Sequence, residues 1–267
     1  MANKSVSFNT KIYLAALLGL SSLAAVAQTA TAPSPAPKGE IIGSAWVHTA
    51  ESLLASAQQA DVVLPAKATG GAIFKGKLKD IPKLSGGKVP VVVFMHGSSG
   101  LALKAIGEWQ QWLAGLGYAS VAPDSFSLPN RVTYKSPIDV DSYERVHALR
   151  GSEIAPTVQA LKSQTWVDAG QLILAGTSEG SVPVAQYTGT EFMARMMYAW
   201  SCEQNYFVKE PKNAFETGKP VLNIISATDP FFSKSNSWIG NANPAGHCGA
   251  ALKGNAMASV LLIPDAP

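Results

Sequence analysis

The feature that most constrains the fold is a run of seven residues, Val89–Met95 (VPVVVFM), which is apolar throughout and rich in β-branched side chains. A strand with one face in water alternates polar and apolar residues, whereas a strand without alternation is buried on both faces. Strands of the second kind occur mainly in parallel sheets that helices cover on both sides. The run therefore predicts a central strand of a parallel sheet.

Segments of strand and helix pattern alternate along the rest of the chain. Further strands are predicted at 118–122, 171–175, Val221–Ser226 and Ala258–Ile263. Apolar residues at helical spacing predict helices around 45–60, over 105–116, over 142–163 and directly after Ser178. Pro156 is expected to kink the third of these helices or divide it in two. The alternation predicts an α/β fold with a mostly parallel central sheet and helices on both faces.

The loop after the predicted strand 171–175 has the pattern G-x-S-x-G, in which Ser178 is the central residue. Ligands of parallel sheets bind at the carboxyl ends of the strands, so this loop lies where chemistry is expected. Its two glycines permit a sharp turn between strand and helix, which lifts a serine hydroxyl above the sheet. We therefore predict Ser178 as a nucleophile. The alternative is an ordinary serine N-cap of the helix that follows.

A second glycine-containing loop, His96-Gly97-Ser98, comes directly after Val89–Met95. A loop of this kind can offer a backbone N–H to an oxyanion that develops during attack on a carbonyl group. We predict that the N–H groups of Ser98 and Glu179 form this pair of donors. His96 itself is expected to pack and hydrogen-bond locally, because it stands before the loop.

An acidic residue, Asp229, follows the predicted strand Val221–Ser226. An acid at this place can orient the histidine of a catalytic triad. The alternative is an Asx turn before a proline. Asp124 also follows a strand, but it precedes Ser178 and so departs from the chain order nucleophile, acid, histidine. The stretch between Asp229 and Ala258 is expected to hold the acid loop and a last crossover helix.

The chain resembles the α/β-hydrolase superfamily, and within it the dienelactone-hydrolase-like group. The resemblance spans residues 88–267 and rests on five segments: VVVFMHGSSGL at 91–101, APDSF at 122–126, LILAGTSEGS at 172–181, ISATDP at 225–230 and VLLIPDAP at 260–267. It implies a Ser-Asp-His hydrolase that cleaves carboxylic esters or lactones through an acyl-enzyme, with no cofactor and no metal ion. Founding members of the group carry a cysteine at the elbow, so Ser178 favours a serine esterase over a dienelactone hydrolase.

The sequence contains four histidines: His48, His96, His147 and His247. In the family that the chain resembles, the catalytic histidine follows the final strand, which is Ala258–Ile263 here. We therefore expect the base just beyond Pro267, and residues 41–267 to be a single hydrolase domain truncated at its C-terminus. His247 precedes the final strand and is the alternative base. A non-catalytic periplasmic binding protein and a peptidase, both on the same fold, are further alternatives.

Residues 1–27 have the layout of a secretory signal peptide, with Lys4 and Lys11, an uncharged apolar run and a final Ala-Val-Ala. The alternative is a retained anchor, but the apolar run is shorter than the ~20 residues that a spanning helix needs. Residues 28–40 are rich in proline and alanine and are predicted to be a linker. The mature protein is thus expected to be periplasmic or secreted, without a stable membrane anchor.

The composition fits a small-molecule enzyme better than a nucleic-acid-binding protein. Only 15% of the residues are charged, and 47% are hydrophobic. Removal of residues 1–27 takes away two lysines and no acid, which lowers the formal net charge from +3 to +1. No basic block remains to bind nucleic acid. The expected partner is a small ester or lactone; the oligomeric state stays open.

Two cysteines, Cys202 and Cys248, are predicted to form a disulfide, since an exported protein meets an oxidising compartment. The alternative is a pair of buried thiols. No pair of histidine or cysteine residues has zinc-finger spacing, so no metal site is expected.

Two groups of helical residues are given structural roles. Arg150 and Glu153, three residues apart, are predicted to be an ion pair on the surface. Trp109, Trp112 and Tyr118 are predicted to pack in the core, with an acyl pocket as the alternative.

Overall fold

The computed structural model describes residues 37–264, so the predicted signal peptide and most of the linker lie outside the described part. The main sheet has eight strands: β2 (Asp61–Leu64), β3 (Phe74–Lys77), β4 (Val89–Met95), β5 (Ala119–Ala122), β7 (Val167–Thr177), β8 (Phe192–Tyr198), β9 (Val221–Ser226) and β10 (Ala258–Ile263). Their order is β10-β9-β8-β7-β4-β5-β2-β3. All neighbours from β10 to β5 are parallel, and β2 is antiparallel to both β5 and β3. The predicted α/β fold with a mostly parallel sheet is confirmed.

Two short strands and a set of helices complete the described chain. The strands β1 (Glu40–Ile42) and β6 (Thr133–Lys135) pair with each other. The α-helices are α1 (Ala50–Gln58), α2 (Ala66–Thr69), α3 (Lys104–Gly115), α4 (Val140–Ser152), α5 (Ile154–Lys162) and α6 (Ser181–Gln186). The 3-10 helices are η1 (Leu78–Asp80), η2 (Ser125–Ser127) and η3 (Ser178–Gly180). None of the helices in residues 37–264 is both long and apolar enough to cross a membrane.

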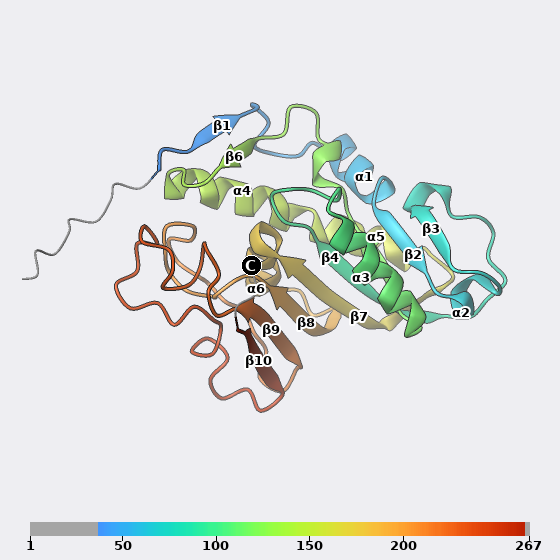
Figure 1. The fold of residues 1–267 in the computed structure, drawn as a ribbon. Coiled ribbons are helices and arrows are strands. Elements are labelled where there is room, and N and C mark those ends of the chain that lie inside the picture. Colours follow the sequence, from blue (N-terminus) through green and yellow to red (C-terminus); the bar gives the residue numbers. More distant parts are fainter. Residues whose placement is uncertain (1–36, 265–267) are drawn as a thin grey trace, which may run out of the picture. The chain divides into compact units, whose positions relative to one another are not determined.

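Helices lie on both faces of the sheet, but they do not cover its faces equally (Figure 1). The larger core cluster joins the sheet to α4, α5 and α6, through residues such as Tyr143, Val158 and Val182. The smaller cluster lies on the other face, where Ile106 and Leu113 of α3 pack on β4 and β7. At the far edge, the outer strand β10 leaves three apolar side chains 41–48% exposed: Leu261, Leu262 and Ile263.

The structure agrees with the predicted elements where the apolar pattern is strong. β4, β9 and β10 have the predicted bounds, and the long helical pattern is divided into α4 and α5 at Glu153. Pro156 then lies in the first turn of α5, where a missing N–H costs little. β2, β3 and β8 were not predicted, because each is short or has a mixed pattern.

One expected element is absent: residues 227–257, between β9 and β10, contain no helix in the described structure. Asparagine side chains hold part of this segment in turns instead. The Asn236 side chain accepts a hydrogen bond from the Trp238 N–H at 3.0 Å, and Asn241 accepts one from the Asn243 N–H at 3.0 Å. Side chains that bond nearby backbone groups in this way compete with helix formation, so the expectation of a crossover helix was wrong.

Candidate active site

The turn after β7 holds Ser178 in a left-handed backbone conformation, with φ at 51°. This region is uncommon for a non-glycine residue and costs about 1–3 kcal/mol, so the surrounding structure must impose it. Two glycines make the turn possible. A Cβ on Gly176 would lie 2.5 Å from the Gly180 carbonyl oxygen, and a Cβ on Gly180 would lie 2.1 Å from the Met95 oxygen. The serine is thus fixed on a tight elbow against the end of β4.

Ser178 lines a cavity of about 210 Å³ at the carboxyl ends of the central strands. We call it the nucleophile cavity; its lining residues are Gly97, Ser98, Ser99, Leu103, Tyr134, Ser136, Ser178, Tyr206, Phe207, Phe231 and Phe232. The loop after β4 reaches the serine closely, since a Cβ on Gly97 would lie 3.4 Å from the Ser178 Cβ. Within residues 37–264, the Ser98 N–H has no hydrogen-bond partner. It is therefore available to an oxygen atom in the cavity.

Asp229 lies directly after β9 and is buried, with 7% of its surface exposed. Its Oδ1 accepts hydrogen bonds from the N–H groups of Phe231 at 2.9 Å and Phe232 at 2.8 Å. Both phenylalanines line the nucleophile cavity. The carboxylate therefore makes the Asx-type turn that was the alternative interpretation. Its Oδ2 has no hydrogen bond to any described residue, so this oxygen is available to orient another group.

No histidine of the described chain hydrogen-bonds to Ser178 or Asp229. The Nδ1 of His247 accepts a hydrogen bond from the Gly249 N–H at 3.0 Å, and the neighbouring Cys248 is joined to Cys202 by a disulfide with the Cα atoms 4.8 Å apart. The structure thus brings the predicted nucleophile and the Ser98 oxyanion donor to one cavity. Asp229 does not line this cavity and is joined to it through the backbone of Phe231 and Phe232. His247 makes no hydrogen bond with Ser178 or Asp229. The predicted pairing of the cysteines is confirmed.

His96 is buried beneath the loop after β4 and is fully used by local hydrogen bonds, as its position predicted. Its Nδ1 lies 2.7 Å from the Gly97 oxygen, and its Nε2 accepts from the Ser125 N–H at 3.2 Å. Burial and the Arg150 charge lower the pKa of His96 to about 3. The ring is therefore neutral and has a structural role.

A cluster of buried charges surrounds the side chain of Glu179, the residue next to the nucleophile. Its Oε1 lies 2.7 Å from Arg131 Nη2 and 2.8 Å from Arg150 Nη1. Burial by itself raises the pKa of Glu179, but the two guanidinium groups outweigh this effect and hold the pKa at about 2. The carboxylate is therefore ionised and faces the core, while its own backbone N–H is the predicted oxyanion donor.

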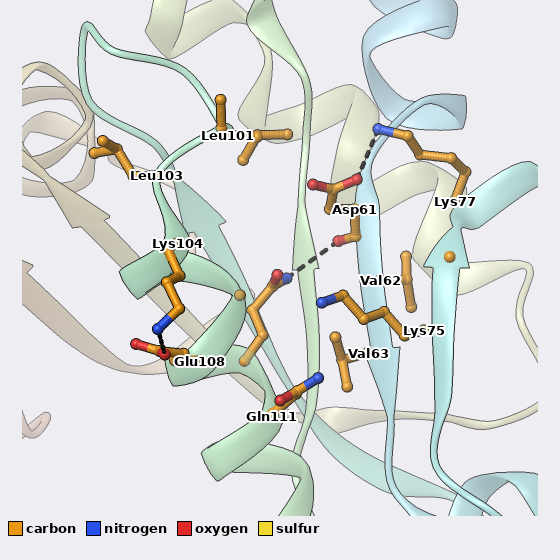
Figure 2. A pocket seen from close by; sticks show the side chains of 14 residues that line it. Asp61, Val62, Val63, Lys75, Lys77, Leu101, Leu103, Lys104, Glu108 and Gln111 are labelled. Atoms are coloured by element: carbon orange, nitrogen blue, oxygen red, sulfur yellow. Dashed lines mark hydrogen bonds and ion pairs between the residues drawn. The ribbon is translucent and has the colours of Figure 1, made fainter.

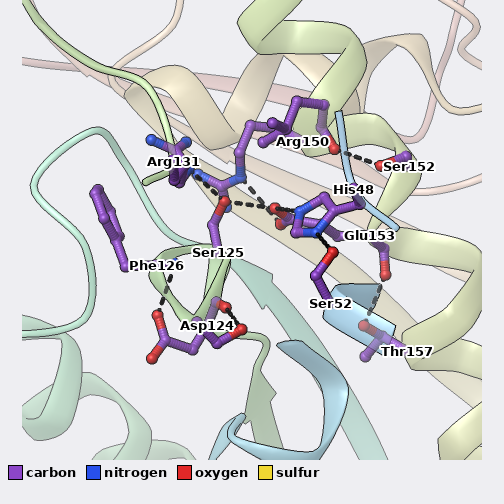
Figure 3. A network of polar contacts seen from close by, with 12 residues as sticks. His48, Ser52, Asp124, Ser125, Phe126, Arg131, Arg150, Ser152, Glu153 and Thr157 are labelled. Carbon is purple, nitrogen blue, oxygen red and sulfur yellow. Dashed lines mark hydrogen bonds and ion pairs between the residues drawn. The ribbon is translucent and has the colours of Figure 1, made fainter. Parts of the chain in front are cut away.

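The same cluster extends to Glu153, as Figure 3 shows. Arg150 Nε donates to Glu153 Oε2 at 3.0 Å, and His48 Nε2 lies 3.0 Å from Glu153 Oε1. Arg150 and Glu153 are both essentially fully buried, so the prediction of a surface pair was wrong. Helical spacing places two side chains side by side, but it does not tell whether their face of the helix meets solvent or another layer.

Several residues of the site carried no signal in the sequence. Arg131 lies 48 residues before Glu179 in the chain and belongs to no motif. Tyr134 and Tyr206 face the nucleophile cavity from β6 and from a loop. Burial, with the Glu179 charge, raises the pKa of Tyr134 well above its ordinary value, so this hydroxyl is neutral. Only the Phe231–Phe232 pair had a clue, since it directly follows the predicted acid loop.

The sequence itself matches no protein-family model and no curated protein. Three solved structures are similar to the chain. A putative dienelactone hydrolase from Klebsiella pneumoniae has a TM-score of 0.50 at 17% identity, with 77% of this chain and 85% of that chain covered. A dienelactone hydrolase-like promiscuous phosphotriesterase from metagenomic libraries has a TM-score of 0.48 at 16% identity, covering 87% and 83%. A cold-adapted esterase from an Arctic intertidal metagenomic library has 0.47 at 15%, covering 67% and 75%.

At identities this low, structural similarity is evidence for the fold alone. The strand order, the strained serine between β7 and η3, and the first of these similarities agree with one another. The chain has the α/β-hydrolase fold.

Proposed function

We propose that the protein is an exported serine hydrolase that cleaves carboxylic esters or lactones, with Ser178 as its nucleophile. The observation that carries the proposal is the strained Ser178 on the elbow, which opens into a cavity beside the free N–H of Ser98. Strained backbone of this kind is concentrated at functional sites. The similar structures described as an esterase and a dienelactone hydrolase support the same class of reaction.

In the proposed reaction, Ser178 Oγ attacks the carbonyl carbon of the ester while a base takes its proton. The N–H groups of Ser98 and Glu179 donate to the oxyanion of the tetrahedral intermediate. The intermediate collapses, the alcohol leaves with the proton from the base, and an acyl-enzyme remains. A water molecule then repeats the sequence, and the carboxylic acid leaves. Because Arg131 and Arg150 hold Glu179, its N–H keeps one orientation throughout.

The base in this proposal is a histidine on the segment that follows β10, and Asp229 orients it. β9 and β10 are parallel and paired residue for residue up to Ser226 and Ile263. The Ala227 N–H also donates to the Ile263 oxygen at 3.0 Å. The backbone that leaves β10 therefore starts beside the loop that carries Asp229, whose Oδ2 is available. His247 is the alternative, and it would have to move from its present contact with Gly249.

Export is the part of the proposal that concerns residues 1–27. The disulfide between Cys202 and Cys248 supports it, because disulfides persist in oxidising compartments. Expression of the full chain in a bacterium, followed by fractionation and N-terminal sequencing, tests it. We expect a mature protein that begins at Gln28 in the periplasm or medium. Cytosolic protein that begins at residue 1 or 2 would contradict export.

The nucleophile is tested with Ser178→Ala, and with Ser163→Ala at the exposed end of α5 as the matched control. Loss of the nucleophile from such a unit costs on the order of 10⁶-fold in kcat, so hydrolysis of p-nitrophenyl butyrate should disappear in the first variant. Labelling by a fluorophosphonate should disappear with it, while Ser163→Ala keeps both. Unchanged turnover in a folded Ser178→Ala protein would contradict the assignment.

The base is tested by translating the coding sequence past codon 267 and comparing two substitutions in that product. We expect His247→Ala to keep turnover, and replacement of a histidine beyond residue 267 by alanine to reduce it by at least about 10³-fold. Loss of turnover in His247→Ala, with the disulfide intact, would move the role to His247. A product that binds ligand but neither hydrolyses esters nor reacts with a fluorophosphonate would support the binding-protein alternative.

A further inference from the structure

A second cavity, of about 250 Å³, lies beside the nucleophile cavity on the α3 side of the sheet; its lining residues are Phe94, Leu103, Ala105, Ile106, Trp109, Thr177 and Tyr198. We call it the aromatic cavity. The Trp109 ring contacts Phe94 with 4.9 Å between ring centroids and Tyr198 with 6.0 Å. Trp109 and Tyr118 pack against the smaller core cluster, as predicted, and Trp109 also lines this cavity, which was the alternative. Trp112, predicted to do the same, is 60% exposed.

Leu103 lines both cavities and so lies between them. The two cavities also meet at the nucleophile elbow, because Thr177 lines the aromatic cavity and the next residue, Ser178, lines the nucleophile cavity. The nucleophile cavity alone is smaller than the roughly 300–1,000 Å³ of ordinary ligand pockets, whereas the two cavities together fall within this range. The side chain of Leu103 thus limits how far a ligand on Ser178 can extend.

The local structure gives no reason for a leucine at position 103. This residue is the N-cap of α3, and its side chain makes no capping hydrogen bond. Serine, threonine, aspartate or asparagine would stabilise the helix start, and leucine is among the poorest residues there. The side chain is also 49% exposed, so it adds little to the core. What it does contribute is an apolar partition between two cavities.

The lining of the two cavities also restricts the charge of the ligand. Among their described lining residues there is no lysine, arginine, histidine, aspartate or glutamate. An ionised group loses its hydration in such a space without gaining a partner, which is costly. The polar side-chain groups among these lining residues are hydroxyls and the indole N–H of Trp109, which suit an uncharged ligand.

A further cavity of the described chain, of about 520 Å³, also has Leu103 in its lining but differs from these two in the charge of its lining residues. It lies between α3 and the strands β2 and β3, and neither Ser178 nor Asp229 lines it (Figure 2). Charged side chains line it, including the ion pairs Lys77–Asp61 and Lys104–Glu108, each at 2.7 Å. Its size therefore does not make it the substrate site.

From these observations we propose that the substrate is an uncharged ester with an apolar acyl chain, which extends from Ser178 past Leu103 into the aromatic cavity. Leu103 is then the residue that determines specificity for chain length. The proposal rests on the proposed ester hydrolysis and adds the substrate class to it.

Chain length is tested with Leu103→Ala on p-nitrophenyl esters from acetate to decanoate, using the full gene product. Each further methylene that becomes buried is worth roughly fourfold in binding. We expect the kcat/KM ratio of decanoate to butyrate to rise about tenfold or more in Leu103→Ala and to fall in Leu103→Phe. Leu103→Ser should shift this ratio as Leu103→Ala does, because both remove most of the side-chain volume at position 103. The N-cap hydrogen bond that serine can add should not affect the ratio.

The matched control is Leu116→Ala, at the other end of α3, where a leucine of similar exposure (57%) lines none of these cavities. The kcat/KM ratio of decanoate to butyrate in Leu116→Ala should stay within twofold of the wild-type ratio. An unchanged ratio in Leu103→Ala, with ester hydrolysis intact, would overturn the role of Leu103 and leave the proposed function standing. An equal shift in Leu116→Ala would overturn it too.

Charge is tested with two substrates of equal length, p-nitrophenyl butyrate and p-nitrophenyl hemisuccinate, whose acyl chain ends in a carboxylate. The neutral ester should have at least a tenfold higher kcat/KM. A preference for the hemisuccinate would overturn the uncharged class.

A binding measurement separates this proposal from the proposed function. The uncharged quencher 10-bromodecan-1-ol should reduce tryptophan fluorescence more strongly in Leu103→Ala than in the wild type, and Trp109→Phe should remove the difference. If this quenching is observed but no ester is hydrolysed, the aromatic cavity binds apolar chains and the proposed hydrolase function fails. Quenching that is the same in Leu103→Ala and Leu116→Ala would overturn the partition.

Discussion

The two halves of the candidate site are held in place by different means. The loops after β4 and β7, which carry Ser98 and Ser178, lie at the middle of the sheet, above a core of buried charges. The loop after β9, which carries Asp229, lies near the sheet edge, next to the half-exposed β10. A long segment without a helix follows it, closed by the disulfide.

The elbow of Ser178 and the loop of Asp229 need different degrees of rigidity. The strained backbone of Ser178 persists only if the surrounding structure prevents it from relaxing, and the fully buried Glu179 and Arg150 provide such surroundings. The acid has only to orient a partner. Turns and a crosslink are sufficient for that, and we expect this segment to unfold locally more readily than the core strands do. Four predictions follow this contrast, from the largest expected effect to the smallest.

Arg150→Met should destabilise the nucleophile half most. It leaves the buried carboxylate of Glu153 without its guanidinium partner and that of Glu179 with only Arg131. Removal of one partner from a buried ion pair costs about 3–5 kcal/mol, which urea unfolding would measure. Arg145→Met, on the same helix but exposed and stacked on Trp46, should cost under about 1 kcal/mol. Equal losses in both variants would remove the claimed difference between buried and exposed charge.

The double variant Cys202→Ser, Cys248→Ser should act on the acid half. The disulfide spans 46 residues, and its loss should lower the free energy of unfolding by about 4 kcal/mol on the chain-entropy model. Hydrogen exchange then separates the halves: amides of 227–236 should exchange faster, while those of β4 and β7 keep their order of protection. Uniformly faster exchange would show that the halves unfold as one unit.

His147→Phe should reduce the loss of folding stability that the protein suffers at low pH. His147 is buried between Tyr143 and Phe207, with no hydrogen-bond partner on either ring nitrogen among the described residues. Burial lowers the pKa of His147 to about 4. A lowered folded pKa means that the unfolded chain binds the proton more tightly, so stability is present above pH ~6.5 and is lost as pH falls toward 4.

This histidine alone should account for about 3 kcal/mol of the stability lost over that range. Unfolding curves at pH 7 and at pH 4 measure it: the difference between the two should be smaller by that amount in His147→Phe. An identical difference in wild type and variant would show that the ring is hydrated or paired at low pH.

The exposed pair Lys104–Glu108 on α3 should give the smallest effect. Its atoms are 2.7 Å apart, as close as those of Arg131 and Glu179, but its side chains are mostly in water. A double-mutant cycle with alanine should give a coupling of only about 0.3–0.5 kcal/mol, and 1 M salt should weaken it. A coupling above 2 kcal/mol would show that distance, and not burial, decides the strength of the pairs in this protein.

Much of the fold was predictable, because the apolar pattern of a buried strand depends only on its own residues. Val89–Met95 and Val221–Ser226 were predicted to the residue for this reason. β8 was missed because its sequence, FMARMMY, includes Arg195, whose guanidinium bonds carbonyl oxygens of Val184 and Tyr187 in the folded chain. A strand whose buried charge is neutralised by groups elsewhere in the chain cannot be recognised from its own residues.

The sequence by itself determined the α/β class, the elbow at Ser178 and the loop of Asp229, since each follows from a short run of residues and the glycines or proline beside it. Only the tertiary structure decided that Glu179 faces two arginines from other elements and that Leu103 divides two cavities. It also decided that His247 makes no hydrogen bond with the nucleophile and does not line its cavity. These relations join residues tens of positions apart, and they depend on which helix face meets the sheet, which no local pattern encodes.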